Sequence, residues 1–215
     1  MKPFQAIIFD MDGVIVDSEP LHERAFREVL QEIGYGQSHG IDFPAYYGMS
    51  DLVVWRDFMA RHRPPQSLEE LLARKEEKFT ALLQREEPLF DGLPELLEKV
   101  SARYSLALAS GSRHPTINVV LDLRGLRRLF RVVVSSEDIA HGKPAPDIFL
   151  RAAELLNVAA KDCCVIEDSA AGVEAGLAAG MTVIAITNSL SPEKLARATK
   201  VVSTYGEMES LLLRG

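Results

Sequence analysis

Short apolar runs alternate with helical patterns over most of this chain of 215 residues, and this alternation restricts the fold more than any other feature. The apolar runs are rich in β-branched and aliphatic residues, which is typical of buried parallel strands. We expect strands at 4–9, 105–110, 131–135, 163–167, 182–187 and 200–203. We expect the helices between them at 93–103, 115–123, 147–156, 170–179 and 192–199. This order predicts an α/β fold with a Rossmann-like parallel sheet covered by helices on both faces.

One segment, residues 18–86, interrupts the alternation and contains no pattern typical of a strand. Apolar residues at helical spacing predict three helices in it, at 21–33, 52–61 and 68–84. An insert after the first strand of a parallel sheet starts near that strand's carboxyl end, where ligands bind in open α/β sheets. We therefore expect a catalytic core of residues 1–17 and 87–215, and an all-helical cap of residues 18–86.

The overall composition limits the partners that the chain can have. Hydrophobic residues make up 47% and charged residues 26%, which is enough to build an ordinary core. The formal net charge of −7 disfavours generic binding to nucleic acid. No apolar stretch approaches the ~20 residues of a membrane span, and the acidic start is unlike a signal peptide. We therefore expect a cytoplasmic protein, monomeric by default, with no nucleic-acid or membrane partner.

The sharpest motif is Asp10-Met11-Asp12-Gly13-Val14, directly after the first expected strand. Residues two apart on an extended chain lie on one face, so Asp10 and Asp12 can address the same point. Two carboxylates that close repel each other unless a cation joins them. Mg²⁺ is a natural partner because it prefers oxygen ligands. On this motif alone, a plain acidic turn after a strand is the alternative.

Three further polar motifs lie at the ends of other expected strands. Ser110-Gly111-Ser112 offers hydroxyls and open backbone N–H groups that suit phosphate oxygens, although a simple turn also fits. Lys143 precedes a helix opened by proline, where it could meet a phosphate or lie solvated in a loop. In Glu167-Asp168, the carboxylates could ligate a metal, or Asp168 could cap the next helix. Because the carboxyl ends of parallel strands share one edge of a sheet, we expect all these motifs to converge.

With these motifs in this order, the sequence resembles the haloacid dehalogenase-like hydrolase superfamily, in its phosphatase and β-phosphoglucomutase-like branch. The matching motifs are DMDGV at 10–14, Ser110 with Gly111, Lys143 in GKPAPDIF, and EDS at 167–169. The resemblance covers nearly the whole chain, including the helical cap. Dehalogenases of this superfamily lack the second aspartate, so Asp12 favours chemistry at phosphorus over cleavage of a carbon–halogen bond.

The resemblance implies a role for each catalytic residue. Asp10 is the nucleophile that becomes an aspartyl-phosphate. Asp12 is the acid/base that protonates the leaving alkoxide and then activates water. Ser110 and Lys143 hold the oxygens of the phosphoryl group during transfer.

The resemblance also implies a magnesium cofactor. Its ligands would be the carboxylate of Asp10, the backbone carbonyl of Asp12 and the carboxylate of Asp168. Glu167 would support this metal site, through water.

Three residues of the expected cap are candidates for substrate contact. His22 lies where similar sugar-phosphate mutases relay protons to the acid/base aspartate, although a polar helix surface also fits. Gly48-Met49-Ser50-Asp51 lies where those mutases carry Gly-x-Ser-Arg, whose arginine holds the distal phosphate. Asp51 reverses that charge, and a carboxylate repels a second phosphate at close range. Trp55 could stack on a sugar or fill the core of the cap.

The sequence therefore predicts a Mg²⁺-dependent phosphatase that hydrolyses small phosphomonoesters, sugar or polyol phosphates, through an aspartyl-phosphate intermediate. Asp51 favours water over a second sugar as the final phosphate acceptor. A β-phosphoglucomutase-like sugar phosphomutase is the alternative. A non-catalytic binding protein on the same fold is a more remote one.

Overall fold

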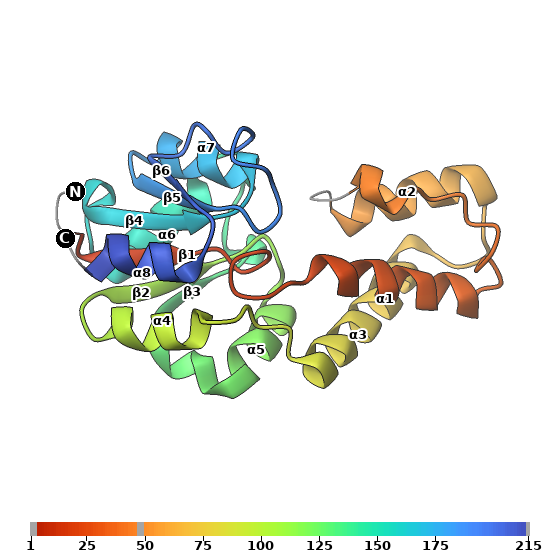
Figure 1. The fold of residues 1–215 in the computed structure, drawn as a ribbon. Coiled ribbons are helices and arrows are strands. Elements are labelled where there is room, and N and C mark those ends of the chain that lie inside the picture. Colours follow the sequence, from red (N-terminus) through yellow and green to blue (C-terminus); the bar gives the residue numbers. More distant parts are fainter. Residues whose placement is uncertain (1–3, 47–49, 214–215) are drawn as a thin grey trace. The chain divides into compact units, whose positions relative to one another are not determined.

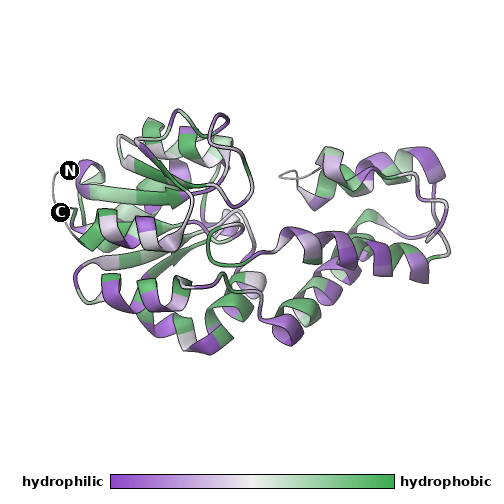
Figure 2. Ribbon diagram, in the orientation of Figure 1, coloured by the Kyte–Doolittle hydropathy of each residue, from purple (hydrophilic) through white to green (hydrophobic). Residues whose placement is uncertain are grey.

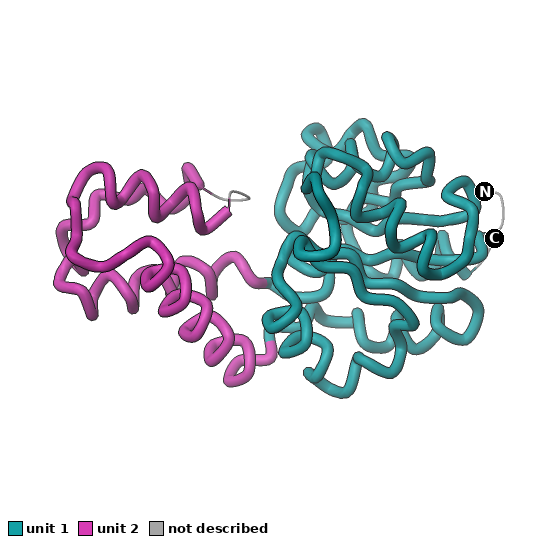
Figure 3. Tube along the Cα trace, turned by 180° about the vertical axis from the view of Figure 1, so that it is seen from behind, with its two compact units in different colours: residues 1–17, 88–215 teal, residues 18–87 magenta. Residues whose placement is uncertain are grey.

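The computed structural model describes residues 4–46 and 50–213, and the chain forms two compact units. One consists of residues 1–17 and 88–215, and the other of residues 18–87 (Figure 3). We call them the core unit and the helical unit. The chain returns to the core unit at Pro88, one residue later than the sequence predicted. Glu87 still belongs with helix α3 (Leu68–Glu86), because its backbone N–H bonds the carbonyl of Leu83 at 3.0 Å.

Within the described residues, the core unit is built on a six-stranded sheet in the order β3-β2-β1-β4-β5-β6 (Figure 1). All of its strand pairs are parallel. The strands are β1 (Ala6–Phe9), β2 (Ser105–Ala109), β3 (Phe130–Val134), β4 (Cys163–Glu167), β5 (Thr182–Ile186) and β6 (Lys200–Val202). The six strands predicted from the sequence are confirmed, and so is the α/β fold class. β1 lies between β2 and β4, so its carboxyl end is flanked on both sides.

Apolar side chains on both faces explain why these short runs form buried strands. Ile8 packs into a cluster with residues of α6 and α7, while the ring of Phe9 lies edge-on to Phe130 on the opposite face, with centroids 6.2 Å apart. Figure 2 shows the hydrophobic residues concentrated on the strands and on the helix faces that cover them. The helices of the core unit are α4 (Leu93–Ser101), α5 (His114–Asp122), α6 (Asp147–Leu156), α7 (Ala170–Ala178) and α8 (Tyr205–Leu213).

The predicted helix at 192–199 is wrong. The segment forms successive turns, in which the N–H groups of Lys194 and Leu195 bond carbonyls three residues back, at 3.0 and 3.2 Å. Leu195 is the one fully buried residue of this segment, so packing gives too little support for a helix. The sequence analysis also missed α8, a helix that buries Tyr205, Met208 and Leu212.

The helical unit contains α1 (Glu19–Glu32), the short 3₁₀ helix η1 (Phe43–Tyr46), α2 (Asp51–His62) and α3. The three helices predicted for the cap are confirmed, although Gly48 and Met49 of its predicted motif lie outside the described residues. The unit has its own core, built around Phe26, Trp55 and Phe58. No helix in the described part of the chain is both long and apolar enough to cross a membrane.

The two segments of the core unit that connect it to the helical unit pair with each other. The backbone N–H of Asp17 donates to the carbonyl of Pro88 at 2.9 Å. Val16 and Leu89 form an antiparallel bridge beside this bond. The helical unit is therefore inserted through two paired segments, seven residues after Asp10 in the sequence.

Candidate active site

The predicted catalytic side chains of the core unit lie at the carboxyl ends of adjacent strands. Phe9 of β1 is in register with Ile166 of β4, so Asp10 and Glu167 occupy neighbouring positions at this edge. The backbone N–H of Asp10 continues the ladder by bonding the carbonyl of Ile166 at 3.0 Å. Ser110 directly follows β2, the other neighbour of β1.

Lys143 reaches these carboxylates from the loop before α6. Its Nζ donates to Asp10 Oδ1 at 2.5 Å and to Glu167 Oε1 at 2.6 Å. Burial alone would lower the pKa of Lys143, but the attraction of Asp10 and Glu167 outweighs it and raises the pKa above its ordinary value. Lys143 is therefore a permanent positive charge between two carboxylates, and the interpretation of a solvated loop lysine is wrong.

Asp10 is a buried carboxylate with a raised pKa. Desolvation is the largest cause, the charge of Lys143 opposes it, and the charges of Glu167 and Asp168 add to it. The pKa of Asp168 is raised to about 7, first by burial and then by Glu167. Both pKa shifts have the same causes, burial first and then the charges of the neighbouring carboxylates.

The carboxylate cluster of Asp10, Glu167 and Asp168 can hold a metal ion. Each places an oxygen within 4.8 Å of the others, and all three side chains are buried. With one ammonium among three carboxylates, two negative charges remain uncompensated when all three are ionised. Hard oxygen donors with excess negative charge are what Mg²⁺ prefers, so this donor set fits that ion. Asp12, predicted to contribute its backbone carbonyl, adds no side-chain oxygen to this cluster.

Gly13 makes room for this cluster. A Cβ at this position would lie 1.8 Å from Asp168 Oδ2 and 2.7 Å from Ser189 Oγ. Its φ of +75° is also in the region that L-residues rarely adopt. The glycine of the DMDGV motif therefore allows the loop after β1 to approach the end of β4.

Glu167 is held by four hydrogen bonds. Besides the bond from Lys143 to Oε1, its Oε2 accepts from the backbone N–H groups of Asp168 and Ser169 at 2.8 and 2.9 Å, and from Ser169 Oγ at 2.9 Å. A Cβ on Gly172 would lie 1.6 Å from Oε1, so this glycine admits the carboxylate. α7 is capped by Ser169, whose Oγ accepts from the N–H of Gly172 at 3.0 Å, and the alternative of a cap by Asp168 is wrong.

The second predicted aspartate is tied to the loop after β2. Ser112 Oγ donates to Asp12 Oδ2 at 3.0 Å, and the backbone N–H of Ser112 donates to Ser110 Oγ at 3.0 Å. Gly111 has open space where a Cβ would stand. The Ser110-Gly111-Ser112 turn therefore lies beside Asp12 and leaves open space at Gly111.

Two residues that the sequence analysis missed support the loop after β1. Asn188 Nδ2 donates to the carbonyl of Gly13 at 2.8 Å and to Tyr205 Oη at 2.9 Å. Tyr205 Oη donates to the carbonyl of Val14 at 2.6 Å. Asn188 shortly follows β5, so its place at the carboxyl edge could have been predicted from strand order. Tyr205 begins the helix that the sequence did not reveal.

The three candidates of the helical unit have different surroundings. His22 Nδ1 lies 3.9 Å from Asp51 Oδ1, and both side chains contact Lys75, which the sequence analysis missed. Trp55 is 0% exposed and packs between Phe26 and Phe58 in the core of the unit. Of the two roles that the sequence left open for Trp55, filling the core is the one that matches its burial.

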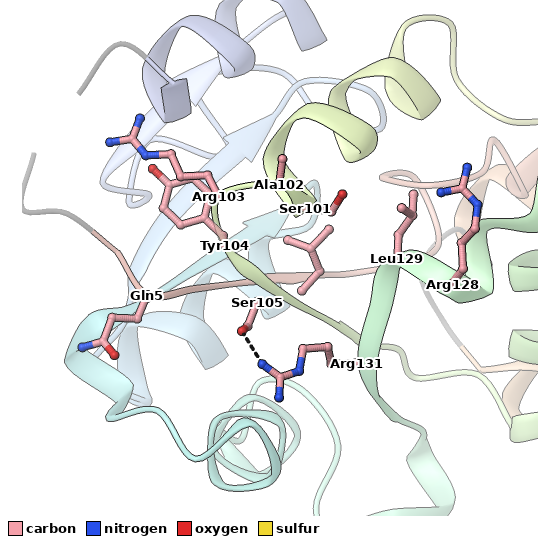
Figure 4. Close-up of a pocket in the computed structure, with 10 residues that line it drawn as sticks. Gln5, Ser101, Ala102, Arg103, Tyr104, Ser105, Arg128, Leu129 and Arg131 are labelled. Atoms are coloured by element: carbon pink, nitrogen blue, oxygen red, sulfur yellow. Dashed lines mark hydrogen bonds between the residues drawn. The ribbon is translucent and has the colours of Figure 1, made fainter.

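A hollow on the core unit lies away from the predicted site residues of that unit. It is lined at the amino ends of β1, β2 and β3 by residues that include Gln5, Tyr104 and Arg131 (Figure 4). Arg131 Nη1 donates to Ser105 Oγ at 3.0 Å there. The hollow contains no residue predicted for the site, which lies at the opposite ends of the same strands.

Comparison with known proteins gives consistent matches. A family model for haloacid dehalogenase-like hydrolases matches residues 4–180. The chain is 35% identical over 185 residues to the fructose-1-phosphate phosphatase YqaB of Escherichia coli K12, covering 84% of this chain and 95% of that protein. It is also 35% identical over 197 residues to a phosphorylated carbohydrates phosphatase of Thermotoga maritima, covering 88% of each.

The fold is similar to a solved structure of the same type. The crystal structure of a putative β-phosphoglucomutase from Thermotoga maritima matches with a TM-score of 0.78 and 33% identity. The match covers 97% of this chain and 96% of that one.

Fold and site together define an α/β enzyme with a carboxylate–lysine centre at the carboxyl edge of a parallel sheet. The chain belongs to the haloacid dehalogenase-like hydrolase family. The resemblance inferred from the four motifs is thereby confirmed, in the branch of phosphatases and β-phosphoglucomutase-like proteins.

Proposed function

We propose that this protein is a Mg²⁺-dependent phosphatase that hydrolyses small phosphomonoesters, sugar or polyol phosphates, through an aspartyl-phosphate at Asp10. The position of Asp10 carries the proposal. Its buried carboxylate is bonded to Lys143 and lies in one acidic cluster with Glu167 and Asp168. Relatives named for fructose 1-phosphate and for phosphorylated carbohydrates support the substrate class.

In the first half-reaction, Asp10 attacks phosphorus and the bond from phosphorus to the leaving alkoxide breaks. Lys143 bonds Oδ1 of Asp10, which leaves Oδ2 as the attacking oxygen. Asp12 gives its proton to the alkoxide, which departs as a neutral alcohol. The hydrogen bond from Ser112 holds the carboxyl group of Asp12 in a fixed direction for this transfer.

In the second half-reaction, Asp12 takes a proton from water as the water oxygen attacks phosphorus. The bond between phosphorus and Asp10 breaks, so free carboxylate and inorganic phosphate are formed. Ser110 and the backbone N–H of Gly111, where no side chain intervenes, hold the phosphoryl oxygens throughout.

The acidic cluster fits the cofactor that this scheme needs. Mg²⁺, held by Asp10, Asp168 and the backbone carbonyl of Asp12, would neutralise the charge of the phosphate and of Asp10. Glu167 already accepts four hydrogen bonds, so its part is to position Lys143 and the backbone of residues 168 and 169.

A sugar phosphomutase is the second candidate, because the structure of a putative β-phosphoglucomutase matches nearly the whole chain. A mutase returns the phosphoryl group of Asp10 to a sugar and releases little phosphate. Asp51 stands where similar mutases carry an arginine for the second phosphate, and this favours the hydrolase.

Release of inorganic phosphate across a panel of sugar and polyol monophosphates tests the proposal. Each substrate is measured with and without a sugar bisphosphate, and with Mg²⁺ or EDTA. We expect Mg²⁺-dependent release that needs no bisphosphate. Rapid isomerisation with negligible phosphate release would show that the protein is a mutase.

A further inference from the structure

Helix α5 starts directly after the Ser110-Gly111-Ser112 turn, and its own sequence supplies no cap for it. The residue before the helix, Arg113, makes no capping bond with its side chain, and the first turn contains no acidic residue. The first N–H groups of a helix have no partner within the helix. Pro115 carries no N–H, so the N–H of His114 is the one that needs an acceptor at this helix start.

Glu137 provides this acceptor from a different part of the chain. It lies in the short 3₁₀ helix η3 (Ser136–Asp138), shortly after β3. Its Oε2 accepts from the backbone N–H of His114 at 2.9 Å, and its Oε1 accepts from Arg113 Nε at 3.1 Å. The bond from His114, and then that from Arg113, hold the pKa of Glu137 below its ordinary value. Since a negative charge is favourable at a helix N-terminus, Glu137 caps α5 from the loop after the neighbouring strand.

The backbone around Glu137 is held by a capping box. Ser135 Oγ accepts from the N–H of Glu137 at 2.9 Å, and Asp138 Oδ2 accepts from the N–H of Ser135 at 2.8 Å. Nε2 of His114 lies 3.1 Å from Oδ1 of the same aspartate, beside the bond that Glu137 makes. The carboxylate of Glu137 therefore extends from a turn with a defined position.

The Ser110-Gly111-Ser112 turn is attached to the same strand and loop at both of its ends. The backbone N–H of Ser110 bonds the carbonyl of Val134 in β3 at 3.0 Å, which continues the sheet. The carbonyl of Ser112 accepts from the backbone N–H of Ser136 at 3.2 Å. Glu137 adds the bonds to the two residues that follow Ser112 in the chain.

This turn carries groups that the proposed reaction uses. Ser110 and the N–H of Gly111 hold the phosphoryl oxygens, and Ser112 Oγ directs Asp12 through a hydrogen bond of 3.0 Å. A glycine increases the number of backbone conformations that a turn can adopt. The orientation of this turn therefore depends on the attachments at its ends.

We propose that Glu137 is a positioning residue for phosphoryl transfer: by capping α5 from the loop after β3, it fixes the turn that holds the phosphoryl oxygens and directs Asp12. The inference rests on the proposed function, since the turn acts on the phosphomonoester that Asp10 attacks. A carboxylate repels phosphate at close range, so Glu137 acts through the turn and not on the substrate.

Glu137→Ala removes both acceptor oxygens. We would measure kcat and KM for phosphate release from a preferred sugar monophosphate with saturating Mg²⁺. We expect kcat to fall by about tenfold to 100-fold while KM changes less than about threefold, because misplaced groups affect the transition state more than the bound substrate. Glu137→Gln keeps an oxygen that can accept from the N–H of His114, so its kcat should stay within about threefold of wild type.

Glu98→Ala is the matched control. Glu98 lies on α4 of the same unit and likewise accepts from a surface arginine, Arg128, at 3.1 Å. This variant loses the same side chain and the same kind of ion pair, away from the turn. It should keep the wild-type kcat.

Amide hydrogen exchange gives a second measurement that needs no substrate. The backbone N–H of Ser112 donates to Ser110 Oγ at 3.0 Å, so its exchange reports on the turn. We expect this N–H to exchange at least about tenfold faster in Glu137→Ala than in wild type, with the amides of β1 unchanged.

Four results would overturn the inference: a wild-type kcat in Glu137→Ala, an equal loss of kcat in Glu98→Ala, an equal loss in Glu137→Gln, or unchanged exchange of the Ser112 amide. If wild-type protein releases no phosphate from any monoester, the proposed function fails. The exchange of the Ser112 amide then still decides whether Glu137 fixes the turn.

Discussion

Among the described residues, each unit encloses a lysine between acidic and aromatic side chains, but the two groups of residues balance their charges differently. In the core unit, Lys143 bonds Asp10 and Glu167 and lies 5.0 Å from the centroid of Phe149. Asp168 adds a third carboxylate. In the helical unit, Lys75 has one carboxylate partner, Asp51, and a neutral histidine.

This difference also appears in the pKa values. In the helical unit, Asp51 and Lys75 cancel each other's charge, and the lowered pKa of His22 keeps its ring neutral. The core cluster is buried and keeps excess negative charge; burial first, and then this charge, raise the pKa of Asp10 and of Asp168, and a cation would relieve the repulsion. The proposed site of chemistry therefore has an excess of carboxylates over lysine, whereas the lysine of the helical unit is paired with a single carboxylate.

The largest expected effect is the loss of activity in Asp10→Asn. The amide keeps the size of the side chain and cannot form an aspartyl-phosphate, so we expect kcat to fall by about 10³-fold or more. Phosphate release from a preferred sugar monophosphate measures this. Circular dichroism checks that the fold is kept.

Asp122→Asn is the control for this variant, since Asp122 is exposed at the end of α5. It should have wild-type activity. Near-normal turnover in purified Asp10→Asn protein would disprove the assignment of the nucleophile and with it the contrast between the two clusters.

The next-largest effect is a difference in the free energy of unfolding that is lost when each of the two lysines is replaced. Lys143→Met leaves three buried carboxylates without a cation, and breaking a buried pair in this way costs about 3–5 kcal/mol. Lys75→Met leaves Asp51, which is 32% exposed and can be hydrated, so we expect a cost of only about 1–2 kcal/mol. Urea denaturation of both variants at neutral pH without metal gives the two free energies of unfolding. Equal costs would show that the charge balance of the clusters is not what distinguishes them.

Magnesium should stabilise the protein more at high pH than at low pH. The pKa of Asp168 is about 7 in the folded protein and about 4 in an unfolded chain. The folded state thus binds the proton of Asp168 more tightly than the unfolded chain does. Protonation of Asp168 therefore adds to the free energy of unfolding; this contribution is full below about pH 4 and is lost as the pH rises through about 7. Mg²⁺ replaces the lost proton, so the increase in Tm on adding MgCl₂ should be larger at about pH 8 than at about pH 5.5.

Asp168→Asn provides the comparison for the magnesium effect. It removes one of the repelling carboxylates, so metal-free protein should lose less stability between these two pH values, and Mg²⁺ should raise its Tm less. A magnesium effect of the same size at both pH values, in both proteins, would contradict the role of Asp168 in the acidic cluster.

Much of the fold followed from the sequence because buried strands and amphipathic helices leave periodic patterns. The six strands and the three helices of the helical unit were predicted in this way. The segment 192–199 has helical composition and fails to form a helix because it buries one leucine. α8 was missed since its nine residues, from Tyr205 to Leu213, have little amphipathic contrast.

The active site could be predicted in part for a related reason. Residues directly after parallel strands must share one edge, so Asp10, Ser110 and Glu167 could be grouped before any coordinates were known. Lys75 carried a weaker signal, a charged residue at a position where helical spacing calls for an apolar one. Its partner Asp51 comes from another helix, and such a pairing depends on tertiary packing that no local pattern records.

The smallest expected effect concerns neutral hydrogen bonds, one in each unit. Tyr205→Phe removes the donor to the carbonyl of Val14 and the acceptor of Asn188, beside the loop that carries Asp10 and Asp12. Ser67→Ala removes the oxygen that accepts from the N–H of Glu70 and caps α3. Each should cost about 1 kcal/mol of unfolding free energy. Only Tyr205→Phe should also lower kcat, by about twofold to tenfold, because the loop after β1 positions the nucleophile. If Ser67→Ala lowered kcat equally, the loss in both variants would reflect general destabilisation. The hydrogen bonds of Tyr205 would then have no specific effect on the position of the nucleophile.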